Sequence, residues 1–226
     1  MNWRRTTALA IAAAVSAGGP ALLLGQTTAP ASSPATAPAS SETRRIVEAA
    51  AAQVLGVLRD GQLPTDQKSQ RASAIVEDNI DFPTFARLAS GPAWNDMTDV
   101  QRDQFLSEFH KLVRSIFIEG IDQYDGQDAV VTDERQEPRG DRVVRMRIID
   151  TRGGQRRDVT GVDFRLRQFD GRWKAIDLSI AGISLAVACR AQFAGFLRDG
   201  GVSRVIQVLK EKNAKREREE GSGHGK

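Results

Sequence analysis

Residues 126–180 alternate between apolar and polar side chains, and this alternation limits the possible folds more than any other feature of the chain. Successive side chains of a β-strand point to opposite faces, so a period of two predicts strands. The pattern covers residues 128–133, 142–150, 158–169 and 172–180. Gly-containing turn sequences separate these segments, and Asp170-Gly171 is typical of a tight hairpin. The stretch therefore predicts a four-stranded antiparallel meander.

The two faces of this predicted sheet differ in chemistry. One face is apolar and carries Val144, Met146, Ile148, Val162, Phe164 and Leu166. The opposite face is basic and carries Arg145, Arg147, Arg165 and Arg167. We interpret the basic face either as solvated surface or as a docking surface for acidic partners or anionic lipid. Nucleic acid is not an expected partner, because exposed aromatic side chains for base stacking do not alternate with these arginines.

Helical spacing flanks the strands on both sides. Apolar residues recur every three to four positions in residues 42–59, 66–79, 82–90, 98–124, 184–198 and 203–215. Thr98 and Gln101 fit a capping box, and Asp81 and Ser184 are placed to cap the helices that follow them. Helices before and after an antiparallel sheet predict an α+β fold, with the helices packed on one face of the sheet.

The chain divides into four parts. Residues 1–25 begin with Arg4 and Arg5 and continue with an interrupted apolar run, which is typical of a cleaved signal peptide. A retained membrane anchor is the alternative. Residues 26–41 form a Pro/Ala/Ser-rich linker that cannot build a core. Residues 42–215 are predicted to form a single domain, and residues 216–226 a flexible charged tail. We expect an exported, soluble mature protein.

The composition offers little for catalysis or metal binding. Cys189 is the one cysteine and the chain has two histidines, so neither an intramolecular disulfide nor a Cys/His zinc site is expected. Sequence motifs of serine hydrolases, phosphate-binding loops and zinc proteases are absent. We predict no cofactor, no metal and no catalytic residue. Asp177 is expected to accept backbone N–H bonds, and Arg190 either to pair with a carboxylate or to stand at a cavity mouth.

Broad helix stripes and a bulky sheet face are compatible with an ordinary core or with a pocket beneath the helices. If a pocket is present, strand parity places the apolar face named above in its wall. Helical spacing adds Leu112, Ile116 and Phe117 as its roof, and the fourth strand adds Ile176 and Leu178 to its floor.

Three segments together carry a family resemblance. Residues 173–193 contain Trp-Lys-x-x-Asp-Leu-x-Ile-x-Gly-Ile-Ser-Leu, residues 85–113 contain Gly-x-x-Trp followed by Thr-x-x-Gln-Arg-x-x-Phe, and residues 200–212 contain Gly-Gly and Leu-x-x-Lys. The chain resembles the MlaC-type, or toluene-tolerance, family of periplasmic phospholipid-binding proteins over roughly residues 44–212.

The resemblance implies a periplasmic carrier that holds phospholipid acyl chains inside an α+β shell of the cone-shaped, NTF2-like type. Its implied partners are an outer-membrane lipoprotein or porin complex and an inner-membrane ABC transporter with its substrate-binding ring. Its implied role is to maintain the lipid asymmetry of the outer membrane. A hopanoid carrier of the same family, a small enzyme on an NTF2-like fold and an envelope adaptor with a solid core stay open. Two titratable groups facing one pocket would favour the enzyme.

Overall fold

The computed structural model describes residues 41–152 and 154–223. In chain order, its elements are α2 (Glu42–Arg59), α3 (Thr65–Glu77), α4 (Phe82–Ser90), η1 (Gly91–Trp94), α5 (Asp99–Asp122), β1 (Asp128–Gln136), η2 (Pro138–Gly140), β2 (Arg142–Asp150), β3 (Arg157–Phe169), β4 (Arg172–Ile180), β5 (Ile183–Ser184) and α6 (Leu185–Gly223). The predicted signal peptide, and the linker up to residue 40, lie outside the described residues.

The strands form an antiparallel meander in the order β1-β2-β3-β4-β5. The predicted α+β meander is confirmed, with one strand more than expected. The additional strand, β5, pairs over Ile183 and Ser184 after a turn at Ala181 and Gly182. Both turn residues have positive φ, at 50° and 81°, which matches the twist of a tight hairpin. A two-residue strand is too short to produce an alternating pattern, so the sequence did not indicate it.

Each pairing among the four long strands contains one extra residue. Met146 and Arg145 pair with Val131 and Asp133, so Thr132 is the extra residue of β1. By the same count, Val159 is extra in β3 and Ile176 is extra in β4. Bulges of this kind bend a strand and increase its twist. Three of them in neighbouring pairings bend the sheet away from a flat layer.

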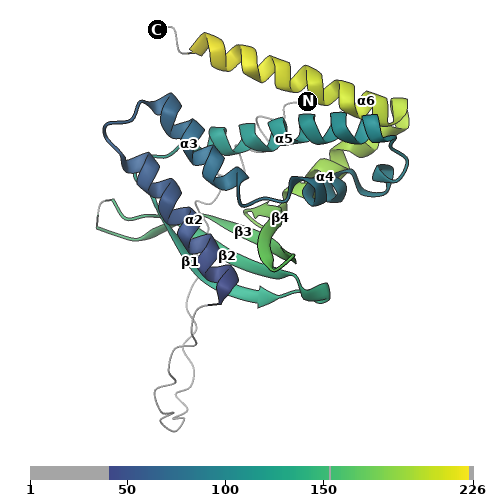
Figure 1. The fold of residues 1–226 in the computed structure, drawn as a ribbon. Helices are drawn as coiled ribbons and strands as arrows, with labels where there is room; N and C mark the ends of the chain where they lie inside the picture. Colours follow the sequence, from purple (N-terminus) through teal and green to yellow (C-terminus); the bar gives the residue numbers. More distant parts are fainter. Residues whose placement is uncertain (1–40, 153, 224–226) are drawn as a thin grey trace, which may run out of the picture.

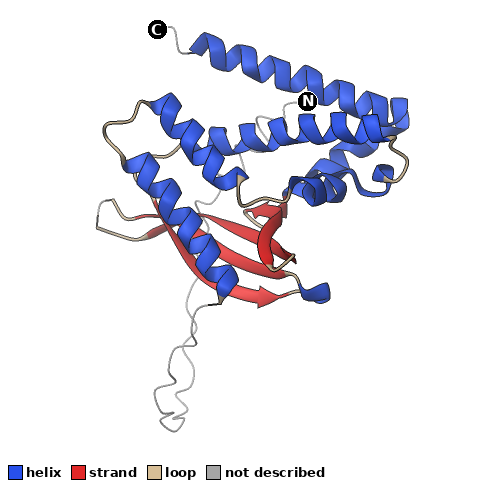
Figure 2. Ribbon diagram, in the orientation of Figure 1, coloured by secondary structure: helices blue, strands red, loops and turns tan. Residues whose placement is uncertain are grey.

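The α-helices gather on one side of the sheet (Figure 2), as the sequence predicts. Helix α2 crosses the sheet over β1 and β2, whereas α4, α5 and α6 pack together beyond β4 (Figure 1). The link between α3 and α4 joins this helical layer to the sheet, because Ala175 N–H donates to the Asn79 carbonyl and Asp81 N–H to the Ala175 carbonyl, both at 2.8 Å. The layer is therefore fixed against β4, close to its bulge.

The predicted caps are present in the structure. Asp81 Oδ2 accepts a hydrogen bond from Thr84 N–H, and Thr98 and Gln101 form a reciprocal capping box at the start of α5. Ser184 Oγ accepts from Val187 N–H at 3.1 Å in the first turn of α6. Gly200 and Gly201 have non-helical backbone angles and divide α6 into two helical segments, in agreement with the break between the predicted helices 184–198 and 203–215. The second segment continues through residues 216–223, part of the stretch expected to be a flexible tail.

Candidate functional site

The hydrophobic core is divided into two clusters. The larger one joins α4, α5 and α6 around Phe85, Phe105 and Phe109, none of which is exposed. The smaller one lies between α2 and the sheet and contains Val47, Val144 and other buried side chains of β1, β2 and β3. A domain of this size normally has one contiguous core with small satellites. The division therefore points to a space between the two clusters.

A cavity of about 430 Å³ occupies that space. Its wall includes Ile80, Ile116 and Leu178 from the larger cluster, together with Val47, Met146 and Leu166 from the smaller one. Phe164 packs against both clusters and also lines the cavity. We call this space the chamber. Most of its wall is aliphatic or aromatic, so it suits an apolar guest of small-molecule size.

Eight of the eleven wall residues predicted from the sequence line the chamber: Ile116, Phe117, Met146, Ile148, Val162, Phe164, Leu166 and Leu178. Strand parity was sufficient to place most of the sheet's contribution. Whether these side chains contact a ligand stays a prediction, because the chamber wall alone does not identify its guest.

Three predicted wall residues lie elsewhere. Leu112 is 3% exposed and belongs to the larger, helical cluster. The apolar surface of α5 is broad, and only a part of it lines the chamber, while the part with Leu112 packs against other helices. Val144 is buried in the smaller cluster with Val47 and Leu166. Ile176 is the extra residue of the β4 bulge, so the alternation that would have placed it in the wall is broken there.

Helix α2 supplies a part of the wall that the sequence analysis missed. Its contribution consists of Ile46, Val47, Ala50, Ala51, Val54, Leu55 and Leu58. The helical spacing of residues 42–59 predicted an apolar face on this helix, but spacing alone does not predict which element that face packs against. The small side chains of Ala50 and Ala51 leave room between the helix and the sheet.

The chamber is polar at one end. Here its wall is formed by Glu119, Gln123, Tyr124, Gln127 and Asp128, from the end of α5 and the start of β1. Asp128 pairs across the strands with Ile149 and Ala129 with Ile148. Thr160 pairs with Ile148 on the next strand, which places it at the same end of the sheet. We call the five polar residues named first, Glu119, Gln123, Tyr124, Gln127 and Asp128, the rim, and Thr160 lies next to them.

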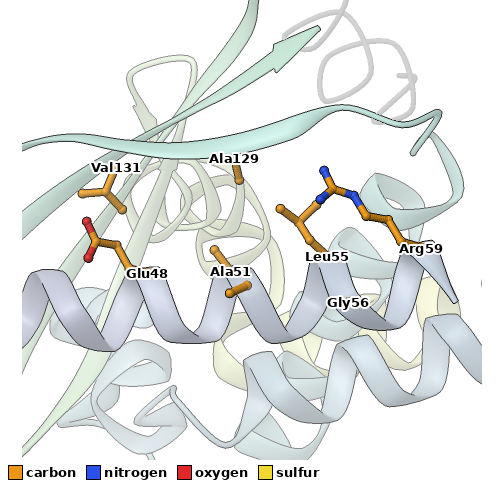
Figure 3. Close-up of a pocket in the computed structure, with 8 residues that line it drawn as sticks. Glu48, Ala51, Leu55, Gly56, Arg59, Ala129 and Val131 are labelled. Atoms are coloured by element: carbon orange, nitrogen blue, oxygen red, sulfur yellow. The ribbon is translucent and has the colours of Figure 1, made fainter. Parts of the chain in front are cut away.

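A second cavity of about 400 Å³ runs along the outer side of α2, between this helix and β1 (Figure 3). Ala51, Leu55 and Ala129 line both this groove and the chamber. Arg59, at the end of α2, also lines the groove, and its side chain extends toward Leu55 on the side that faces β1 (Figure 3). The two spaces are therefore separated by a single layer of small or medium side chains.

The arginines of the opposite sheet face are paired with carboxylates. Arg145 makes two hydrogen bonds to Asp163, at 2.9 and 3.0 Å. Arg165 and Arg167 both bind Asp141, which is fully buried. Arg147 is held less closely, with its Nη1 3.9 Å from Asp158 Oδ2. The prediction that this face docks acidic partners therefore depends most on Arg147.

The joint between β4 and α6 is structural. Asp177 accepts hydrogen bonds from Leu178 and Ala186 N–H, at 2.8 and 3.0 Å, as expected for a carboxylate at this turn. Burial raises the pKa of the Cys189 thiol to about 12, with a smaller contribution from Asp177, so this cysteine stays protonated. Arg190 donates to the Leu88 carbonyl, and it lines neither the chamber nor the second cavity. Its side chain lies against Gly91, where a Cβ would approach it to 3.0 Å.

Residues 41–152 and 154–223 contain no group of three or more His, Cys, Asp or Glu side chains that could hold a metal ion. Within the same residues, no helix has both the length and the hydrophobicity needed to cross a bilayer. The acidic groups of the chamber wall, Glu119 and Asp128, both lie at the rim, where they pair with Arg216 and Arg59.

Comparison with known proteins agrees with this architecture. A solved structure of a phospholipid-binding protein from Ralstonia solanacearum, in complex with a phospholipid, superimposes with a TM-score of 0.66. It shares 24% sequence identity and covers 77% of this chain and 98% of its own. None of the curated proteins compared with the chain matches it. The profile of the MlaC protein family matches residues 48–211, so the chain belongs to the MlaC family.

Proposed function

We propose that this protein is a phospholipid carrier that encloses acyl chains in the chamber between α2, α5 and the sheet. The observation that carries the proposal is the apolar chamber that divides the core. Phospholipid is the favoured cargo, because the related protein from Ralstonia solanacearum was solved with a phospholipid. In keeping with the family, we place the carrier in the periplasm, between an outer-membrane complex and an inner-membrane ABC transporter.

The energetics favour an apolar guest. An empty cavity in a protein core lowers the free energy of unfolding by about 24 cal/mol per Å³. If the chamber of 430 Å³ were empty, the fold would therefore lose up to about 10 kcal/mol of stability. That is comparable to the whole stability of a typical domain. The lipid has a cost as well. A 16-carbon acyl chain that moves from a bilayer into water loses roughly 13 kcal/mol of favourable transfer free energy, at about 0.8 kcal/mol per CH₂. A chamber with an apolar wall can return most of this free energy.

The polar groups also favour binding over catalysis. An acid–base enzyme needs titratable groups that face its substrate within hydrogen-bond reach. The acidic wall residues Glu119 and Asp128 lie at the rim and have arginine partners, whereas the other described residues of the wall include no acidic or basic side chain. We therefore infer that the chamber holds its guest without transforming it.

The test is lipid content followed by lipid uptake. Protein purified after expression of the full chain should carry phospholipid, detected by native mass spectrometry. After the lipid has been removed, the protein should extract a labelled phospholipid from vesicles. Protein that neither carries lipid nor extracts it would contradict the proposal, and uptake of a hopanoid in preference to phospholipid would change the cargo.

A further inference from the structure

The rim has a chemical asymmetry that suggests how a lipid is oriented. The wall near Leu166, Ala175 and Phe164 is apolar except for Asn79, and it is polar where α5 ends and β1 begins. Arg59 lines the adjoining groove, and among the described residues that line either the groove or the chamber it is the one cation. A guest with one charged end and one apolar end would be bound with its charge at the rim.

Three residues of the rim hold the guanidinium of Arg59 in place. Its Nε donates to the Tyr124 hydroxyl at 3.1 Å, and its Nη2 lies 3.5 Å from the Gln127 carbonyl oxygen and pairs with Asp128. These three partners all line the chamber. Arg59 lines the groove (Figure 3), its side chain is half exposed, and its partners belong to the chamber wall. The guanidinium therefore lies where the chamber, the groove and solvent meet.

The pair between Arg59 and Asp128 can be exchanged at little cost. Their side chains are 50% and 40% exposed, and ion pairs with this degree of exposure contribute little to stability. A guanidinium binds phosphate oxygens through paired N–H donors, and a phosphate offers more acceptors than one carboxylate. A phosphate group could thus replace Asp128 as the partner of Arg59 without disturbing the fold.

Thr160 is a second, independent observation at this end. Its Oγ1 is buried and has no hydrogen-bond partner among the described residues, although the residue belongs to the chamber wall. A buried hydroxyl without a partner is unfavourable. An ester or hydroxyl oxygen of a guest would supply one. Thr160 shares a strand face with Val162 and Phe164, so it stands between the rim and the apolar interior.

We propose that the rim is a phosphate subsite, in which Arg59 binds the phosphate of a lipid headgroup while the acyl chains lie in the chamber. The proposal rests on the carrier function and adds the orientation of the lipid and a determinant of headgroup preference. Thr160 then lies near the linkage between headgroup and chains. The substrate class that fits is a phosphate-bearing lipid rather than a neutral one.

The experiment compares two lipids with the same labelled chains, phosphatidylglycerol and diacylglycerol, which differ in the phosphoglycerol headgroup. Delipidated protein from the full chain should prefer phosphatidylglycerol. Arg59→Gln should reduce this preference about tenfold, as expected for one charge-assisted contact, while diacylglycerol binding is retained. Asp128→Asn should increase the preference, because it removes the competing carboxylate. Arg45→Gln is the matched control, since Arg45 is exposed on the same helix and lines neither cavity.

Each outcome is decisive. If Arg59→Gln leaves the preference unchanged, or lowers it no more than Arg45→Gln does, the phosphate subsite is wrong while diacylglycerol uptake still supports the carrier. If wild-type protein takes up neither lipid, the carrier function itself fails. Inorganic phosphate alone should not raise the Tm. A rise that Arg59→Gln abolishes would assign the rim to free phosphate instead of a lipid headgroup.

Discussion

At the scale of single residues, Asp141 shows how a charge on the outer sheet face is held. It has no exposed surface, and its oxygens accept hydrogen bonds of 2.7–2.8 Å from Arg165 and Arg167. Burial raises the pKa of Asp141, but the hydrogen bonds from Arg167 and Arg165 outweigh it, so the net pKa is lowered. The carboxylate is therefore ionised in the folded protein at any pH near neutral.

We expect Asp141→Asn to lower the free energy of unfolding by about 2–4 kcal/mol at neutral pH, because it removes the charge that two arginines share. A carboxyl group whose folded pKa is depressed contributes its full stability above its unfolded pKa of about 3.9, and the contribution is lost as the pH falls through the folded value. The difference from wild type should thus shrink in strong acid. Urea unfolding at neutral and acidic pH measures it, with the exposed Asp199→Asn as control. Equal stability of the two variants at neutral pH would show that the ion pairs contribute nothing.

At the scale of elements, α5 offers a way to separate the chamber from the stability of the fold. Gly120 lies one turn after Ile116 and lines the chamber, and a Cβ at this position meets no atom within 4 Å. Gly120→Leu should place a side chain in the chamber and also improve helix propensity by about 0.5–1 kcal/mol. We expect a Tm equal to or above that of wild type, together with at least severalfold less bound lipid.

Gly195→Leu provides the comparison for this substitution. Gly195 lies in α6, has the same open space at its Cβ, and belongs to the wall of neither cavity. It should gain a similar helix propensity without losing lipid. Equal lipid content in the two variants would mean that the chamber is not where the lipid is held.

The elements also show what the sequence could predict. The bounds of β2 and β4 agree with the prediction residue by residue, because alternation and turn residues are local properties. The bulges at Thr132, Val159 and Ile176 were not predictable in this way, since an extra residue appears only when two strands are paired. The misplacement of Ile176 in the wall follows directly from this. Likewise, the apolar spacing of residues 42–59 predicted that α2 has a buried face, but it did not predict which part of the molecule that face covers.

At the scale of the whole molecule, the chamber is a collective property. Its sheet wall could be inferred from parity, but its existence depends on where α2 crosses a curved sheet and on how far the helical layer stands from β2 and β3. Neither distance is encoded in a local pattern. The rim was missed for the same reason, because Arg59, Tyr124 and Asp128 meet only once α2, α5 and β1 are assembled. Family resemblance supplied the expectation of a lipid guest that periodicity could not.

The outer sheet face gives the last prediction, which concerns docking of the whole carrier. Of the four arginines proposed to meet acidic partners, Arg147 has the loosest ion pair, and both it and Asp158 are about half exposed. Arg147→Glu should leave stability within about 0.5 kcal/mol of wild type, as is usual for surface substitutions. It should weaken binding to the substrate-binding ring of the inner-membrane transporter at low salt. The loss should diminish as salt screens exposed charges.

Arg156→Glu makes the same charge change at an exposed site in the β2–β3 connection and is the control. Binding titrations of both variants at low and high salt decide the matter: if the two variants bind equally well, the arginine face is solvated surface and not a docking site.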